Sequence, residues 1–219
     1  MAKRQDIQSL ALSRTRILRS ALDLADREGL EGLSMRKVAQ GLGVQAMSLY
    51  NHVANKEDLI DGMVELVVEK MAVPEVGKAW QGEMRRRAIV AHEVLLRHPW
   101  AAIALMSRVN VGPMMLRYID ATLGCLHAGG FSLVMADHAW NAIDSHIYGF
   151  TMQELKFPFE PEDYAEAAKM GEGLIPAELY PNMHWLTIEV MERRYDGLHE
   201  FEFGLNMVLD GLERLLATG

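Results

Sequence analysis

The amino-acid sequence predicts an all-α protein in which a small helix-turn-helix domain precedes a larger helical domain. Apolar residues recur at helical spacing along most of the 219 residues, and no pair of alternating runs around a tight turn indicates a β-hairpin. In addition, residues 34–56 place two short helical patterns around Gly43, as in a helix-turn-helix. We expect an N-terminal three-helix domain, with an arm before it, over residues 1–56 and a second domain over residues 57–219.

The first predicted helix covers residues 14–28, where apolar side chains form a broad stripe. Ser13 precedes it and is a residue type that caps helix N-termini. Gly29 follows it, and glycine commonly ends helices because it enters the left-handed region without a Cβ penalty. The same reasoning gives Ser34 as the cap of the second helix.

The second and third helices form the helix-turn-helix. The apolar face of the second helix has i, i+3, i+4 and i+7 spacing and consists of Met35, Val38, Ala39 and Leu42. Gly43 then supplies the turn, and an apolar pattern restarts with Val44, Leu49 and Val53. The second of two helices arranged in this way can enter the major groove of DNA.

Asn55 begins the fourth predicted helix, and Asp58 three residues later gives a variant of the capping box. The apolar pattern continues to Met71, and Pro74 ends the helix. At about 1.5 Å per residue, this helix is long enough to connect the helix-turn-helix mechanically to the rest of the chain.

The remaining residues also predict helices. The expected ranges are 79–97, 100–107, 113–128, 133–155, one short helix near 162–172 inside a proline-rich insert over 156–183, 184–195 and 197–217. We expect Arg85, Arg86 and Arg87 to lie on a solvated face of the first of these helices. His98, next to the helix-breaking Pro99, is expected to cap that helix or face solvent.

The net charge of −8 is divided unevenly along the chain. Residues 1–56 carry nine Lys/Arg and five Asp/Glu, a net charge of +4, whereas residues 57–219 carry 13 and 25, a net charge of −12. This asymmetry indicates a nucleic-acid-binding N-terminal end. The single cysteine, Cys125, excludes an internal disulfide and a zinc site built on cysteines. Since we find no signal peptide and no membrane-spanning apolar run, we expect a cytoplasmic protein without a membrane partner.

Several fixed spacings occur together within residues 33–63. Leu-Gly-Val stands at the turn, a hydroxyl residue followed by Leu-Tyr lies in the recognition helix, a histidine comes two residues later, and Asn-Lys opens the next helix. In this order the stretch resembles the TetR family of transcriptional repressors. The resemblance implies a DNA-binding domain whose contacts come from the second helix, the recognition helix and the start of the fourth helix.

The resemblance implies a role for each of five residues. Arg36 is placed for a base edge or a phosphate, both of which suit a guanidinium. Gln45 can make polar contacts to bases, while Ala46 and Met47 can meet thymine methyl groups. Lys56 lies where a helix N-terminus and an ammonium can share one phosphate.

Four further residues complete the implied DNA-binding set, and these are Ser48, Tyr50, Asn51 and His52. Ser48, Tyr50 and His52 match positions that touch phosphate or brace the recognition helix. For Tyr50 and His52, packing within the small domain remains an alternative. Residues 1–13 are either an arm that touches the DNA backbone or a tail without such a role.

The second domain carries a weaker resemblance, in residues 129–150 and 109–113, to the ligand-binding half of the same family, in particular its tetracycline-repressor branch. The resemblance implies a ligand-binding and dimerisation domain over residues 57–219. The chain departs from that branch at Asn110, where the branch has a metal-binding histidine, and at Gln153, where it has a carboxylate near the magnesium. We therefore predict no metal site and no cofactor.

Polar residues that interrupt apolar helix faces, with methionines beside them, predict a mostly apolar pocket for a small molecule. The predicted ligand-binding residues are Met106, Asn110, Met114, Tyr118, Thr122, Trp140, Asp144 and Gln153. The alternative for each residue is a place in the core, and Asp144 can also face solvent or lie in a dimer interface. The sequence holds none of the hydrolase, metalloprotease or phosphate-binding motifs, so we predict no catalytic residue.

The resemblance implies a homodimeric repressor that binds a palindromic operator and is released by a small-molecule effector. Helices 133–155 and 197–217 of two copies would pack as a four-helix bundle. Two-fold symmetry would place the recognition helices one DNA turn, about 34–36 Å, apart. The alternative function is a dimeric small-molecule-binding protein, or an enzyme on the same scaffold, without DNA recognition.

Overall fold

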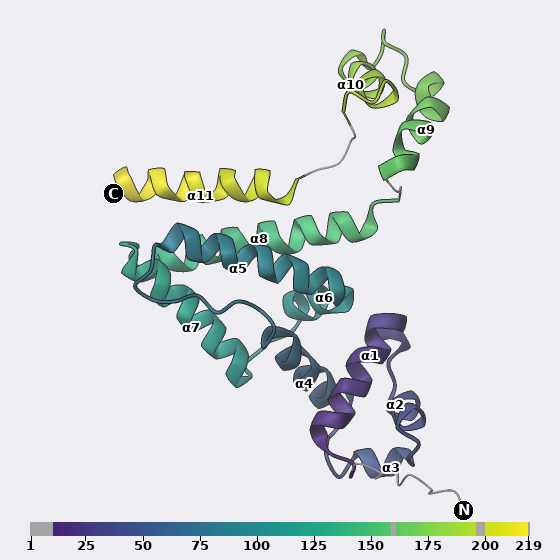
Figure 1. Ribbon diagram of the computed structural model, residues 1–219, viewed down its shortest axis with the longest axis vertical. Helices are drawn as coiled ribbons and strands as arrows, with labels where there is room; N and C mark the ends of the chain where they lie inside the picture. The colour runs from purple at the N-terminus through teal and green to yellow at the C-terminus, as the bar shows by residue number, and fades with distance from the viewer. Residues whose placement is uncertain (1–10, 159–160, 196–199, 219) are drawn as a thin grey trace, which may run out of the picture. The chain divides into compact units, whose positions relative to one another are not determined.

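The computed structural model describes residues 11–158, 161–195 and 200–218, and every regular element in these ranges is helical (Figure 1), which confirms the all-α prediction. The helices are α1 Arg14–Gly32, α2 Met35–Leu42, α3 Ala46–Leu49, α4 Lys56–Val68, α5 Trp80–Arg97, α6 Pro99–Ser107, α7 Pro113–Ala128, α8 Leu133–Lys156, α9 Pro161–Gly171, the 3-10 turn η1 Glu172–Leu174, α10 Pro181–Met191 and α11 Phe201–Thr218. Most of the predicted arm, residues 1–10, lies outside the described residues.

The chain divides into two compact units, Met1–Asn141 and Ala142–Gly219, with the boundary inside α8. The first unit holds α1 to α7 and the first turns of α8. The second unit holds the rest of α8, then α9, η1, α10 and α11. This division falls elsewhere than the predicted domain boundary after residue 56, which stays a prediction.

The predicted ends of α1 are explained by local chemistry. The Ser13 hydroxyl accepts a hydrogen bond from the Arg16 backbone N–H at 3.3 Å and so caps the helix. Gly29 has a φ of 71° and interrupts the helical backbone, although a further turn continues to Gly32. The buried face of α1 packs on α4, where a Cβ at Gly62 would lie 2.6 Å from a Leu18 methyl group. The two helices therefore approach as closely as a glycine permits.

Helix α4 ends at Val68, so the prediction that it reaches Met71 is wrong. The Lys70 and Met71 backbone N–H groups bond to Val67 and Val68, three residues earlier, which closes the helix with a tighter turn. The apolar side chain of Met71 is nevertheless buried, which explains why the apolar period runs past the end of the helix.

At the junction between α5 and α6, His98 caps α5, as one of its two predicted alternatives had it, and does not face solvent. Helix α5 ends at Arg97 and Pro99 opens α6, so His98 connects the two helices outside both. Its ring is buried, not solvated, and lies against Asp26 of α1. Helix α6 thus packs on α1 as well as on α4.

In the second unit, the remainder of α8 packs on α11 through aromatic rings. The His146 ring stacks on Phe201 with centroids 4.9 Å apart, and its Nε2 lies 2.9 Å from the Phe201 carbonyl oxygen. A Cβ at Gly204 would collide with the same imidazole, so glycine is needed for this close packing. Among the described residues, no single helix is long and apolar enough to cross a membrane; α7 and α8 meet that criterion only as a bent pair.

Candidate DNA-binding surface and its connection to the effector domain

Helix α2 begins and ends at two local signals that the sequence predicted. The Ser34 hydroxyl accepts a hydrogen bond from the Lys37 backbone N–H at 3.3 Å and caps α2. Gly43 adopts the left-handed conformation, with φ 69° and ψ 29°, and its N–H bonds back to the Ala39 and Gln40 carbonyls. The chain can therefore reverse direction immediately before the recognition helix.

The recognition helix α3 is only one turn long and is held by its apolar residues. Leu49 is fully buried and Val53 nearly so, which anchors the C-terminal end of α3 and the loop after it in the small core. Met47 and Tyr50 point outward, with 75% and 46% of their surface exposed. Gln45, at the N-cap, is exposed and makes no side-chain capping bond. Gln45 and Met47, two of the residues predicted to contact bases, are thus presented to solvent by a buried anchor.

The other predicted DNA-binding residues differ in their surroundings. Arg36, in the first turn of α2, and Asn51 are exposed, whereas Ala46, Ser48 and His52 are half-buried. Lys56 is also half-buried, and its ammonium lies 3.4 Å from the Leu30 carbonyl oxygen. Because an ammonium has three donors, this contact leaves two of them for a phosphate.

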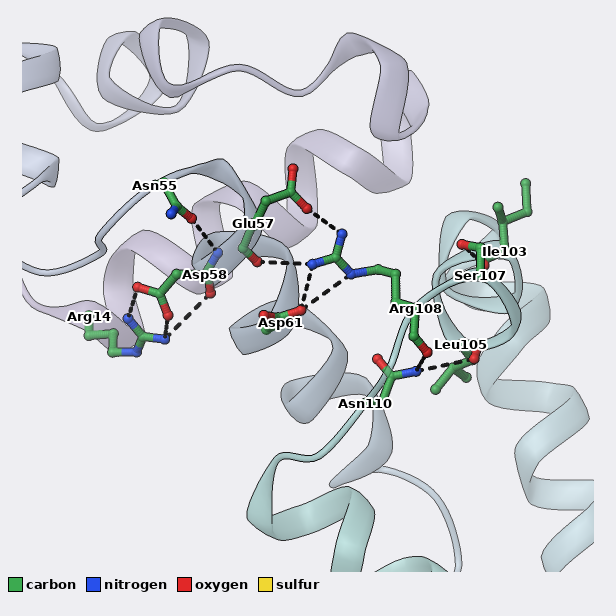
Figure 2. A network of polar contacts seen from close by, with 10 residues as sticks. All are labelled: Arg14, Asn55, Glu57, Asp58, Asp61, Ile103, Leu105, Ser107, Arg108 and Asn110. Carbon is green, nitrogen blue, oxygen red and sulfur yellow. Dashed lines mark hydrogen bonds and ion pairs between the residues drawn. The ribbon is translucent and has the colours of Figure 1, made fainter.

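An ion pair braces the segment that follows the recognition helix (Figure 2). Asn55 caps α4 by accepting the Asp58 N–H at 2.8 Å, and the Asp58 carboxylate accepts the Ala54 N–H at 2.8 Å. The Arg14 guanidinium donates to both Asp58 oxygens at 2.6 and 2.9 Å and to the His52 carbonyl at 3.0 Å. These bonds to Arg14, and then to Ala54, lower the pKa of Asp58 to about 2. Helix α1, the recognition segment and α4 are thereby locked together.

Three carboxylates lie at four-residue intervals on α4 and therefore share one face: Glu57, Asp61 and Glu65. Arg108, at the end of α6, reaches the first two (Figure 2). Its guanidinium pairs with the Glu57 carboxylate and donates to one Asp61 oxygen at 2.7 and 3.2 Å. The bonds to Glu57 and then Asp61 raise the pKa of Arg108. Exposed ion pairs of this kind contribute only about 0–1 kcal/mol to stability, so their main consequence is a defined position for α4.

The third carboxylate of this face, Glu65, binds the start of α7. It accepts the backbone N–H groups of Met114 at 2.8 Å and Met115 at 3.2 Å, where the positive end of the helix favours an anion. A Cβ at Gly112 would collide with the same carboxyl group. Asn110 donates its amide to the Leu105 and Arg108 carbonyls at 3.1 and 3.0 Å. The whole connection between α6 and α7 is thus fixed against α4.

The prediction that Arg87 is solvated is wrong. Only 1% of Arg87 is exposed, and its Nε donates to the Thr122 hydroxyl at 3.1 Å. Its guanidinium carbon lies 4.5 Å from the centre of the Tyr118 ring, a cation–π distance. Thr122 in turn donates to the Tyr118 carbonyl at 2.7 Å. Two predicted ligand-binding residues, Tyr118 and Thr122, therefore meet around a buried cation that the sequence interpretation missed.

The remaining predicted ligand-binding residues differ in their surroundings. Met114 and Trp140 are half-buried in the first unit, and Met106 is 53% exposed at the end of α6. The other two, half-buried Asp144 and exposed Gln153, belong to the second unit. Tyr118 and Thr122 are thus joined by a polar contact, while Asn110 and Met114 both lie at the connection to α4.

Two family models match this chain. The model described as bacterial regulatory proteins, tetR family, matches residues 17–63, and the model described as tetracyclin repressor-like, C-terminal domain, matches residues 73–216. The chain belongs to the TetR family. It is therefore a DNA-binding transcriptional regulator that is released by a small-molecule effector, and not an enzyme; action as a dimer is typical of the family.

The chain is similar to two repressors in sequence and to a crystal structure with a bound small molecule. The chain is 31% identical to the HTH-type transcriptional repressor DrrR1 of Streptomyces coeruleorubidus, over 94% of this chain and 79% of that protein. It is 28% identical to the tetracycline repressor protein class D of Escherichia coli, over 92% and 89%. The crystal structure of the TetR family protein ActR from Streptomyces coelicolor with actinorhodin gives a TM-score of 0.76 at 27% identity, covering 93% and 96%.

Proposed function

We propose that this TetR family regulator acts in the cytoplasm as a homodimeric repressor that reads a palindromic operator with α2 and α3. The observation that supports this most directly is the recognition helix, where buried Leu49 holds Met47 out into solvent. A mostly exposed methionine beside Gln45 suits a base-reading surface that combines apolar and polar contacts. The net charge of +4 over residues 1–56 supports phosphate contacts by Arg36 and Lys56.

Removing single methyl groups from the operator tests this reading. We expect replacement of one thymine by deoxyuridine in each half-site to weaken wild-type binding by about 0.8 kcal/mol per half-site, since each subunit loses only a methyl contact. The Met47→Ala variant should not distinguish the two bases at that position. Fluorescence anisotropy with DNA from the region upstream of the gene itself provides the measurement.

Arg36→Ala serves as the control for this experiment. It is expected to cost about 1–3 kcal/mol of operator binding, whether thymine or uracil is present. If no deoxyuridine position affects the wild-type protein, Met47 does not read thymine. If Arg36→Ala also binds normally, the second helix is not part of the interface.

We infer that a second copy covers the outer face of α11. This helix has two apolar faces, of which the inner one is buried and consists of Phe201, Leu205, Leu209 and Leu212. The outer one is exposed and consists of Phe203, Met207 and Leu215. On α8 the exposed residues Ala142, Ser145 and Gly149 are small and allow close packing of another helix.

Met207→Glu is therefore expected to be monomeric in sedimentation velocity, because it would bury an unpaired charge in the interface. The matched control is Met47→Glu, which alters an equally apolar and even more exposed side chain of the DNA-binding domain. The control should remain dimeric. A dimeric Met207→Glu protein would show that the interface lies on another face.

We propose further that the effector binds in the larger domain and acts through the connection between α6 and α7. Tyr118, Thr122, Met106, Asn110, Met114 and Trp140, all in the first unit, are the proposed contacts. Because Asn110 and Gln153 replace metal ligands, we do not propose a magnesium-bound tetracycline. The ActR complex makes actinorhodin the first compound to test. Movement of the connection would shift α4 through Arg108 and Glu65.

Arg108→Ala is expected to bind the operator normally but to respond poorly to the effector. Its guanidinium fixes α4 to the end of α6, so its loss should raise the actinorhodin concentration for half-release about tenfold. Electrophoretic mobility shifts at increasing actinorhodin measure this. Arg97→Ala is the control, since Arg97 is a more exposed arginine that pairs with its own helix neighbour Glu93. If both variants leave the operator at the same actinorhodin concentration, the effector does not act through Arg108.

A further inference from the structure

A buried histidine at the junction of α5 and α6 joins a charged side chain of α1 to one at the end of α4. The His98 Nδ1 lies 2.8 and 2.9 Å from the two Asp26 carboxylate oxygens, and its Nε2 lies 2.8 Å from the Lys70 ammonium. The Trp100 indole N–H also donates to Asp26, at 2.7 Å. Asp26 belongs to α1, and Lys70 lies in the turn that closes α4.

Only one protonation state of His98 satisfies both neighbours. A lysine ammonium has three donors and no acceptor, so at 2.8 Å it must donate to Nε2, which then carries no hydrogen. The ring proton therefore sits on Nδ1 and is donated to Asp26. This is the neutral imidazole.

We propose that the Lys70–His98–Asp26 chain is a proton-sensitive link, closed when His98 is neutral and opened at Lys70 when His98 is protonated. A proton on Nε2 would place an N–H of a cationic ring against the ammonium, so Lys70 must withdraw. The Nδ1–H bond to Asp26 survives the change and becomes a bond between opposite charges. Acid therefore detaches the end of α4 while α1 stays attached.

When His98 is protonated, Lys70 is the charged group that moves away. The charges facing the ring are Asp26 from α1 and Lys70 from the end of α4. On the helix that precedes the ring, Arg97 turns its guanidinium back to Glu93. Lys70 is largely exposed and can return to water at little cost, whereas His98 is buried.

The consequence concerns α4, which carries the three carboxylates that hold the connection between α6 and α7. Its N-terminal end is fixed by Asn55 and Asp58, and Lys70 fixes its C-terminal end. Histidine normally changes charge between about pH 5 and pH 8. The free energy that holds the end of α4 on the larger domain would thus depend on pH, independently of any effector.

Hydrogen exchange on the full-length protein tests the link without operator or effector. Protection factors for residues 63–71 are compared at about pH 7.5 and about pH 5.5. We expect the wild-type protein to lose protection about tenfold at the lower pH, as for the loss of one charge-assisted hydrogen bond. In His98→Gln, the amide can donate to Asp26 and accept from Lys70 at either pH, so protection should stay high. Lys70→Met should show low protection at both pH values.

His138→Gln, which alters an exposed histidine on α8, is the matched control and should respond to pH as the wild type does. Equal wild-type protection at the two pH values would overturn the proposal. So would a His98→Gln protein that follows the wild-type response. If His98→Gln does not fold, as judged by circular dichroism, Lys70→Met decides, because a pH response of wild-type size in that variant also refutes the link.

Discussion

Leu49→Ala is expected to abolish operator binding while the larger domain stays folded. Leu49 is fully buried and is the main anchor of α3, a helix of one turn without a side-chain cap. Removing such a side chain costs about 2–5 kcal/mol. A core of about 50 residues is marginal alone, so a loss of this size approaches the entire stability of the DNA-binding end.

Operator binding is measured by fluorescence anisotropy, and the folding of each part by amide signals in nitrogen-15 spectra. Amide signals of residues 14–68 should broaden or collapse, while those of α5 and α7 should remain dispersed. Met47→Ala is the comparison, because that side chain is exposed on the same helix and its truncation should leave stability within about 0.5 kcal/mol. A Leu49→Ala protein with wild-type affinity and spectra would mean that α3 is held by other contacts.

Arg87→Ala is expected to produce the largest loss of stability in the larger domain, about 2–5 kcal/mol. The change removes a buried cation from between Thr122 and the Tyr118 ring and leaves a cavity beside them. Arg87→Met fills most of that volume without a charge and should cost much less, since a buried ionic group can often be replaced by an apolar one.

Urea denaturation followed by tryptophan fluorescence compares the two variants through their midpoints and slopes. The order of stability should be wild type, then Arg87→Met, then Arg87→Ala. If Arg87→Met is as unstable as Arg87→Ala, the charge itself is required. If both match the wild type, Arg87 contributes no net stability.

The features that could be predicted from sequence are those set by neighbouring residues. Ser13, Ser34 and Asn55 cap helices in which the bonded N–H lies three residues away, and Gly43 makes its turn by its own backbone conformation. Such signals need no knowledge of tertiary structure. The end of α4 was misjudged because buried Met71 continues the apolar period after the helical hydrogen bonds have stopped.

The buried polar residues could not be placed in this way, because their partners are distant in sequence. Arg87 bonds to a residue 35 positions later, and His98 to one 72 positions earlier. One signal was available for Arg87, since three successive helical residues span about 200° and cannot all lie on one narrow solvated face. Nothing comparable marks His98, whose burial depends on how α6 packs on α1.

The separation of roles within α3 has a consequence for the divergence of such repressors. Leu49 and Val53 determine whether the helix folds, whereas Gln45 and Met47 project from it and contribute little to its packing. Substitutions at the two outward positions can therefore alter the preferred DNA sequence without unfolding the domain. A duplicated gene could acquire a new binding site in a few mutational steps and keep its dimer and its response to an effector.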